Sequence, residues 1–243
     1  GGAIGLPLDV TDRDSFSRFL DEVERAHGPL DVLVNNAGVM HMERFLDEDD
    51  AAAVRQVDIN LHGVIIGSKL ALERFVGRGR GHLVNIASSA GKFGIAGIAT
   101  YSATKHAVVG LTEALRSELR GTGVELSVVM PGIVNTELTD GVKDTRGVKR
   151  VEPDDVAEAI VDALRTGRFD VFVPKSIGSL WRGMAVLPRR FNEGLGRALK
   201  SDRVMMDFDR QRRAGYELRA RQSEPSLEAP DAPAELPERA EAG

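Results

Sequence analysis

The residues best suited to chemistry are a tyrosine and a lysine four positions apart, Tyr101 and Lys105, with Ser88 thirteen residues upstream. On a helix, residues four apart share a face, so the Lys105 ammonium can lie beside the Tyr101 phenol. A nearby cation favours ionisation of a phenol, whose pKa is ordinarily about 10. Tyr101 is therefore predicted to transfer a proton near neutral pH. Ser88 can donate a hydrogen bond to a substrate oxygen that gains negative charge.

The context of these three residues favours a redox site over a chance pattern. A surface helix could carry an unrelated tyrosine and lysine at this spacing. However, the chain has only two tyrosines, and the pair follows the apolar run 83–87, which leads directly into Ser88. We therefore predict a proton-transfer site for the interconversion of a carbonyl and an alcohol.

Apolar runs alternate with helical patterns and define the elements that must position this site. The expected strands are Ile4–Val10, Val32–Val34, His82–Ala87, Glu125–Met130 and Phe169–Val173. Strands that alternate with helices predict an α/β fold with a parallel sheet. One helix is expected to begin at Pro153, with Asp154 and Asp155 in its first turn, and to stop at Gly167.

Several motifs follow one another in a characteristic order. They are Asp9–Val10, the turn Asn35–Asn36–Ala37–Gly38 after a strand, Asn60 in a helical stretch, Ser88, Tyr101 with Lys105, and Pro131–Thr136 after a strand. Together they resemble the classical short-chain dehydrogenase/reductase family over most of the ordered chain. The resemblance implies a Rossmann-like, doubly wound parallel sheet, NAD or NADP as cofactor, a small carbonyl or alcohol substrate, and a homo-oligomer.

The resemblance also implies roles for individual residues. Ser88 would orient the substrate oxygen and Tyr101 would move the proton. Lys105 would tune Tyr101, and both would contact the nicotinamide ribose. Asn60 would bend its helix and hold a water that extends the proton relay. These four residues are the candidate catalytic set.

Further positions are implied to border the cofactor. Asp9 and Val10 would lie beside the adenine, although Asp9 could instead simply start a turn before the next helix. The segment that contains Asn35, Ala37 and Gly38 would support the sheet beside the ribose. Ile133 and Thr136 would hold the nicotinamide carboxamide, although Thr136 could be an ordinary loop hydroxyl. Pro131 is also implied to bind the cofactor. No metal site is assigned.

The glycine-rich loop of this family should follow the first strand and open a helix. The stretch Gly1–Gly5 instead runs into an expected strand. We therefore expect a strand–helix–strand–helix segment of roughly 50 residues upstream in the parent protein, because one βαβ unit takes about 30. Without it, the 243-residue chain is expected to bind a dinucleotide weakly. The choice between NAD and NADP depends on a residue in that segment.

Composition is that of a soluble globular protein: 42% of residues are hydrophobic, 28% are charged, and there are no cysteines. We expect residues 1–175 to form the catalytic domain. Residues 222–243 carry a net charge of −5, equal to that of the whole chain, together with four prolines. This composition predicts a disordered acidic tail. The absence of a compact basic patch argues against a nucleic-acid partner, and a cytoplasmic location is expected.

The segment between the catalytic domain and the acidic tail, residues 176–221, is predicted to be a helical lid or an amphipathic extension. Within it, residues 176–200 have a net charge of +4, interleaved with apolar residues that include Trp181. Such a stretch can bind a membrane surface. We favour a lid over the substrate site, and lipid contact would make an apolar substrate more plausible.

The leading hypothesis is an NAD(P)-dependent oxidoreductase. One alternative is a redox-inactive dinucleotide-binding or scaffolding protein, against which the intact Ser88, Tyr101, Lys105 and Asn60 set argues. Another is a sugar epimerase or dehydratase of a related fold. The turn at 35–38 and the short connection 137–151 favour the simple dehydrogenase.

Overall fold

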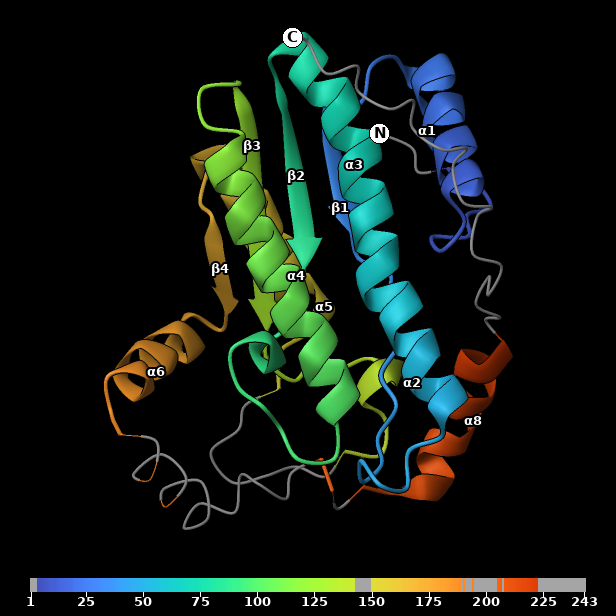
Figure 1. Ribbon diagram of the computed structural model, residues 1–243, viewed down its shortest axis with the longest axis vertical. Helices are drawn as coiled ribbons and strands as arrows, with labels where there is room; N and C mark the ends of the chain where they lie inside the picture. Colours follow the sequence, from blue (N-terminus) through green and yellow to red (C-terminus); the bar gives the residue numbers. More distant parts are fainter. Residues whose placement is uncertain are drawn as a thin grey trace, which may run out of the picture.

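The computed structural model describes residues 4–142, 150–188, 190, 194, 205, 206 and 208–222. Within them, four strands form one parallel sheet in the order β1-β2-β3-β4 (Figure 1). The strands are β1 (Val32–Asn35), β2 (Gly81–Ile86), β3 (Val124–Pro131) and β4 (Asp170–Val173). The predicted parallel α/β sheet is therefore confirmed, and these four strands lie within about a residue of the apolar runs that predicted them.

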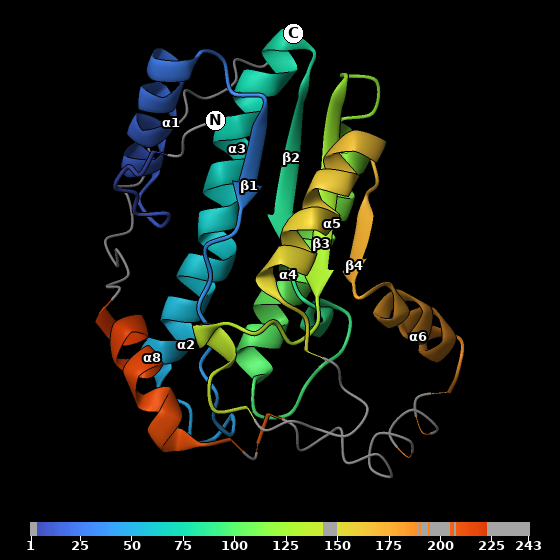
Figure 2. The ribbon, with the colours of Figure 1, turned by 180° about the vertical axis from the view of Figure 1, so that it is seen from behind.

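Helices cover both faces of the sheet, as a doubly wound fold requires. The α-helices are α1 (Arg13–His27), α2 (Asp50–Val57), α3 (Gly63–Arg78), α4 (Ala99–Glu118), α5 (Pro153–Thr166), α6 (Lys175–Ala185) and α8 (Arg210–Gln222). Helices α3 and α4 lie on one face, with α1 packed against α3 (Figure 1). Helix α5 lies on the opposite face over β3 and β4 (Figure 2).

The core follows the two-residue period of the strands. Leu83 faces the side of α3 and α4, whereas its neighbour Val84 belongs to the cluster on the side of α5. Both are fully buried. Successive side chains of a strand point to opposite faces, so a strand buried on both sides is apolar almost throughout. This explains why the apolar residues of β2 serve both faces, Leu83 on one side and Val84 with Ile86 on the other.

The expected boundaries of α5 are confirmed. Its N-cap is Glu152, and a capping box links Glu152 to Asp155, with Pro153 in the first turn. The helix ends before Gly167, whose φ of 64° lies in the left-handed region that glycine adopts readily.

The expected strand at Ile4–Val10 is not formed. Residues 4–9 have no regular structure, and no described strand lies beside them to supply hydrogen bonds. Pro7 also lacks a backbone donor. The apolar signal has another cause, because Leu8 and Val10 pack against the main core without entering the sheet.

The part of the chain that the structure describes contains no helix long and apolar enough to cross a membrane. Residues 223–243 of the predicted acidic tail lie outside the described residues, as do residues 189, 191–193 and 195–200 of the predicted basic stretch. Gln222, the first residue of the predicted tail, is the last residue of α8.

Candidate active site

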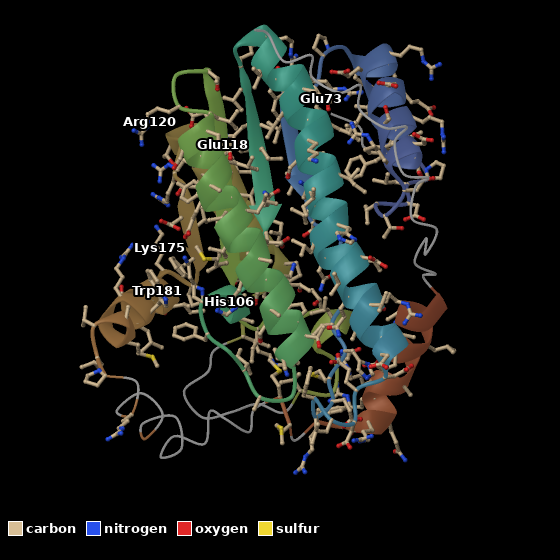
Figure 3. All side chains as sticks on the ribbon, viewed as in Figure 1. Glu73, His106, Glu118, Arg120, Lys175 and Trp181 are labelled. Atoms are coloured by element: carbon tan, nitrogen blue, oxygen red, sulfur yellow. The ribbon has the colours of Figure 1, made fainter. Side chains whose placement is uncertain are left out.

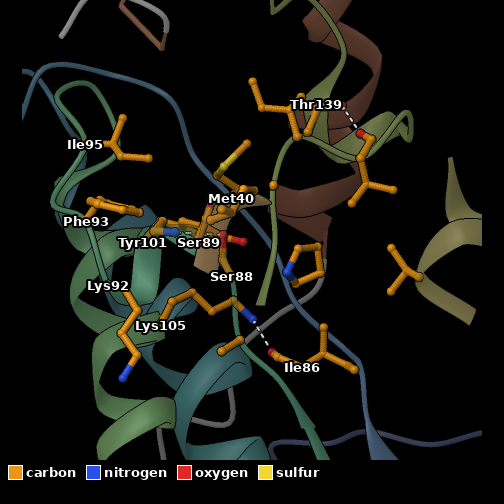
Figure 4. A pocket seen from close by; sticks show the side chains of 18 of the residues that line it. Met40, Ile86, Ser88, Ser89, Lys92, Phe93, Ile95, Tyr101, Lys105 and Thr139 are labelled. Carbon is orange, nitrogen blue, oxygen red and sulfur yellow. Dashed lines mark hydrogen bonds between the residues drawn. The ribbon is translucent and has the colours of Figure 1, made fainter. Parts of the chain in front are cut away.

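A cavity of about 1910 Å³ opens at the carboxyl ends of the parallel strands. Residues that follow all four strands line it, including Asn36 after β1, Ser88 after β2, Gly132 after β3 and Pro174 after β4. Ligands of open α/β sheets bind at this edge. The predicted Ser88, Tyr101 and Lys105 all line this cavity and come together in Figure 4.

Tyr101 and Lys105 occupy the first turns of α4 and share its inward face. Both side chains are buried, and the Lys105 Nζ lies 5.6 Å from the centre of the Tyr101 ring. The four-residue spacing therefore places them as predicted.

The ionisation of Tyr101 differs from the expectation. Burial raises the pKa of Tyr101 to about 12; a hydrogen bond with Ser88 opposes this rise, and Tyr216 adds to it. Burial dominates this shift, and the Lys105 ammonium donates to the Ile86 carbonyl at 2.9 Å (Figure 4). In the protein alone, Tyr101 is a protonated phenol at neutral pH.

Lys105 itself is affected by the same burial. Its pKa is lowered to about 8 because the charged form is desolvated. A protonated amine has three N–H donors, and the Ile86 carbonyl accepts one of them. The others remain for oxygens of a molecule in the cavity.

Ser88 begins a short 3₁₀ turn, η2 (Ser89–Gly91), and is partly exposed to the cavity. Its Oγ accepts a hydrogen bond from the Ala90 amide at 3.1 Å. Because this bond uses an oxygen lone pair, the Ser88 hydroxyl proton can be donated to Tyr101 or to a substrate oxygen.

Asn60 lies in a π-helical turn, η1 (Asp58–His62), that joins α2 to α3. The predicted irregularity of this helix is therefore present. The Asn60 amide group pairs with the backbone of Val39 in both directions, each at 2.8 Å, and also donates to Thr104 at 3.3 Å. It therefore holds the loop after β1. The predicted water relay stays a prediction.

Asn35 is buried in the sheet and lies outside the cavity lining. Its amide donates to the Asn85 side chain at 2.9 Å, and Asn85 in turn donates to Thr112 at 3.0 Å. This chain of buried polar groups connects β1, β2 and α4. It supports the sheet beneath the site, and the predicted contact of Asn35 with the cofactor stays a prediction.

The remaining predicted residues divide between the cavity and elsewhere. Ala37, Gly38, Pro131, Ile133 and Thr136 line the cavity. Asp9 and Val10 do not. The Asp9 carboxylate accepts from the amide and the hydroxyl of Thr11, at 2.8 and 2.7 Å, in a turn before α1. This favours the alternative role of Asp9 as a turn residue.

Gly38 is required for space, not for an unusual backbone angle. A Cβ at this position would lie 3.2 Å from the Asn60 Oδ1 and 3.6 Å from the Lys105 Nζ. The first of these distances is tighter than ordinary van der Waals contact. The missing side chain therefore lets the loop after β1 approach both polar residues.

Helix α6 supplies an apolar wall of the cavity. Trp181, labelled in Figure 3, stacks on Phe172 with a centroid distance of 6.3 Å. Lys92 Nζ lies 4.8 Å from the Trp181 ring and 2.8 Å from a carboxylate oxygen of Glu113 on α4. The start of the predicted lid is thus tied to the segment that follows Ser88.

Sequence reasoning missed Lys92, Met40 and Met205 in this lining. No local pattern marks them. The rarity of tyrosine could have drawn attention to Tyr216, the second of the two, which lies close enough to affect the pKa of Tyr101.

The cavity fits a nicotinamide nucleotide in position and chemistry. It lies at the strand ends where dinucleotides bind, and the two charged side chains among its described lining residues are lysines, Lys92 and Lys105. The described side chains form no group of three or more His, Cys, Asp or Glu that could hold a metal ion.

Residues 1–147 match the family model for short chain dehydrogenases. The ketoacyl reductase HetN of Nostoc sp. strain PCC 7120 is 37% identical over 180 residues, covering 71% of this chain and 61% of that protein. This chain therefore spans less than two thirds of that relative. An uncharacterized oxidoreductase of Staphylococcus aureus strain MRSA252 is 35% identical over 159 residues, covering 65% of this chain and 68% of that protein.

Solved structures show the same fold. A short chain dehydrogenase/reductase from Burkholderia phymatum in complex with NAD superposes with a TM-score of 0.65 at 26% identity, covering 74% of this chain and 73% of that chain. A gluconate 5-dehydrogenase from Burkholderia cenocepacia in complex with NADP and tartrate gives a TM-score of 0.64 at 24% identity, covering 71% and 74%. The latter likeness concerns the fold alone.

Proposed function

We propose that this protein interconverts an apolar ketone or aldehyde and the matching alcohol, with NAD or NADP as cofactor. The chain belongs to the short-chain dehydrogenase family of oxidoreductases. The observation that carries this proposal is the buried Tyr101 phenol, which lines a cavity at the carboxyl ends of the strands together with Ser88 and Lys105.

The bound nucleotide would supply or accept the hydride. Tyr101, protonated at neutral pH, would give its proton to the carbonyl oxygen during reduction. The Ser88 hydroxyl would donate to the same oxygen and stabilise the charge that develops there. Lys105 would direct its remaining donors at hydroxyl groups of the nucleotide. The raised pKa of Tyr101 supports reduction as the direction in which the protein alone is already correctly protonated.

An apolar substrate is supported by the side chains around the catalytic trio. Met40, Ile98 and Met205 pack in the same buried cluster as Tyr101. Further apolar residues that line the cavity are Phe93, Ile95, Ile133, Leu138, Ile177, Leu180, Trp181 and Met184. No carboxylate is among the described lining residues. A pocket of this kind binds by burial of apolar surface and has few groups to pair with a polyhydroxylated substrate.

The test is the oxidation of NADH and of NADPH by the full-length protein with a panel of carbonyl compounds. The panel should include long-chain and aromatic ketones, a ketoacyl ester and a sugar-derived ketone. We expect turnover with one nucleotide and a higher kcat/KM for the apolar ketones than for the sugar. A protein that binds the nucleotide but turns over no member of the panel in either direction would favour the scaffolding alternative.

A further inference from the structure

Helix α8 makes a contact that the proposed catalytic trio does not use. In Figures 1 and 2 it lies beside α2, at the end of the molecule where the strands terminate. Its side chains, among them the buried Arg213, hold the loop after β1, which is far away in the sequence.

Arg213 is the centre of this contact. Its side chain is 1% exposed, although arginine is rarely buried without partners. Nη1 donates to the carbonyls of Leu138 and Asp140 at 2.9 and 3.3 Å, and Nη2 donates to the Met40 carbonyl. Nε donates to Glu217 at 2.6 Å. One planar guanidinium therefore joins two segments that a shorter or more flexible cation could not span.

Neighbouring side chains complete the attachment of the loop. The Tyr216 hydroxyl accepts from the Met40 amide at 2.8 Å, and Glu217 pairs with the His41 ring at 2.7 Å. The His41 amide donates to Gln56 of α2 at 3.0 Å. Both backbone groups of Val39 pair with Asn60, as described above. The backbone of three consecutive residues is thus held by side chains, in a place where an unpaired polar group would be costly.

The two segments that Arg213 joins are walls of the candidate active site. Met40 and Leu138 both line the cavity. Met40 belongs to the buried cluster that contains Tyr101, and Leu138 packs against it. A change in the attachment of α8 would therefore move apolar groups next to the reacting position without touching Ser88, Tyr101 or Lys105.

We propose that Arg213 and Tyr216 are positioning residues that fix the Met40 and Leu138 walls of the substrate site and thereby set its selectivity for bulky apolar substrates. The selectivity part rests on the proposed function. The positioning part does not, because it concerns only the loop and the binding of an apolar molecule.

The test compares Tyr216→Phe and Arg213→Met with Arg212→Met in the full-length protein. Tyr216→Phe keeps the ring and removes one acceptor, so it remains informative if Arg213→Met fails to fold. Arg212 is exposed on the same helix and its replacement removes the same charge. Amide hydrogen exchange of the segment 39–43 should accelerate by about tenfold or more in the first two variants and stay unchanged in the control.

Binding of 2-acetonaphthone is measured by the fluorescence of Trp181, the only tryptophan, which lines the cavity. We expect its Kd to rise about tenfold in Tyr216→Phe and in Arg213→Met. With an active enzyme, KM for this ketone should rise by a similar factor in both variants, with the KM for a small ketone changing less than about threefold. The kcat of Arg213→Met should also change less than about threefold; Tyr216→Phe is not used for this comparison, because Tyr216 acts on the pKa of Tyr101.

The outcomes separate the two proposals. Faster exchange with unchanged Kd and KM would mean that α8 only stabilises the loop, and would overturn the selectivity role. Unchanged exchange would overturn the positioning role. If the unmodified protein turns over no carbonyl, the proposed function fails, while exchange and Kd still decide whether Arg213 and Tyr216 shape the cavity.

Discussion

At the scale of single residues, burial shifts the two central groups of the site in opposite directions. The pKa of Tyr101 is raised to about 12 and that of Lys105 is lowered to about 8, and desolvation of the charged form is the main cause for both. At neutral pH, the buried ammonium of Lys105 therefore lowers the free energy of unfolding. Its position beside the cavity supports a role toward a ligand.

The lowered pKa of Lys105 predicts that the stability of the protein depends on pH. The folded pKa of Lys105 lies below its ordinary value of 10.5, so between about pH 8 and 10.5 the unfolded chain binds more protons and stability rises with pH. The free energy of unfolding of the unmodified protein, relative to that of Lys105→Met, should rise by roughly 3 kcal/mol across this window. Urea unfolding at several pH values measures the difference.

Lys69→Met is the matched control, because Lys69 is exposed on α3. Its stability difference from the unmodified protein should change little over the same window. A flat pH profile for the Lys105→Met difference would contradict the lowered pKa of Lys105.

Ser88 gives a second prediction at this scale. Removing a donor to a developing oxyanion typically costs about 10²- to 10³-fold in kcat. Ser88→Ala should therefore lower kcat by about this factor and leave the affinity for the nucleotide nearly unchanged, as steady-state kinetics and calorimetric titration would measure. Ser117→Ala, an exposed site at the far end of α4, should have the activity of the unmodified protein. A loss of kcat below threefold for Ser88→Ala would remove Ser88 from the proposed mechanism.

At the scale of elements, α6 is the part of the predicted lid that reaches the cavity. Trp181→Ala removes the ring that stacks on Phe172 and contacts Lys92. We expect KM for an apolar ketone to rise about tenfold, with a smaller change in kcat. Val186→Ala is the control, because Val186 at the end of the same helix is 82% exposed and does not line the cavity.

The same variant distinguishes a lid from a membrane-binding segment. If α6 serves mainly the substrate site, the full-length protein should stay in the supernatant when sedimented with anionic vesicles, with or without Trp181. Cosedimentation that weakens with added salt and with Trp181→Ala would instead place this segment at a lipid surface.

Comparison of sequence and structure shows which elements local pattern can predict. The run 82–87 predicts β2 because helices cover both faces of the sheet, so residues that point to either face are buried. The same type of signal fails at Ile4–Val10, since a strand also needs a neighbour, and among the described residues none pairs with this run. There, apolar residues indicate packing against the core alone.

Helix α8 is an element whose contacts could not be predicted from the local sequence pattern. Its charged sequence has no apolar stripe, so nothing local predicts that it docks against the site. The decisive contact joins Arg213 to the Met40 carbonyl, 173 positions away. The pair Tyr101 and Lys105 could be predicted because its geometry is set within one helical turn. The pKa of Tyr101 could not, because burial by the whole fold determines it.

At the scale of the whole molecule, the parallel sheet gathers the ends of four strands at one edge and places the proposed catalytic trio, Ser88, Tyr101 and Lys105, there. Helices α6 and α8 approach this edge from different sides (Figures 1 and 2). The trio lies at the edge itself, α6 lines the cavity, and α8 holds one of its walls. A homo-oligomeric assembly stays a prediction.

The central claim is that Tyr101 transfers the proton in a nicotinamide-dependent carbonyl reaction. The most direct test is the kcat of full-length Tyr101→Phe on the best apolar ketone, with the Kd of the nucleotide measured by calorimetric titration. Phenylalanine keeps the ring in its buried cluster and removes only the hydroxyl. We predict that kcat falls by about 10³-fold or more while Kd changes less than about twofold. A variant that retains kcat within a few-fold of the unmodified protein would contradict the account.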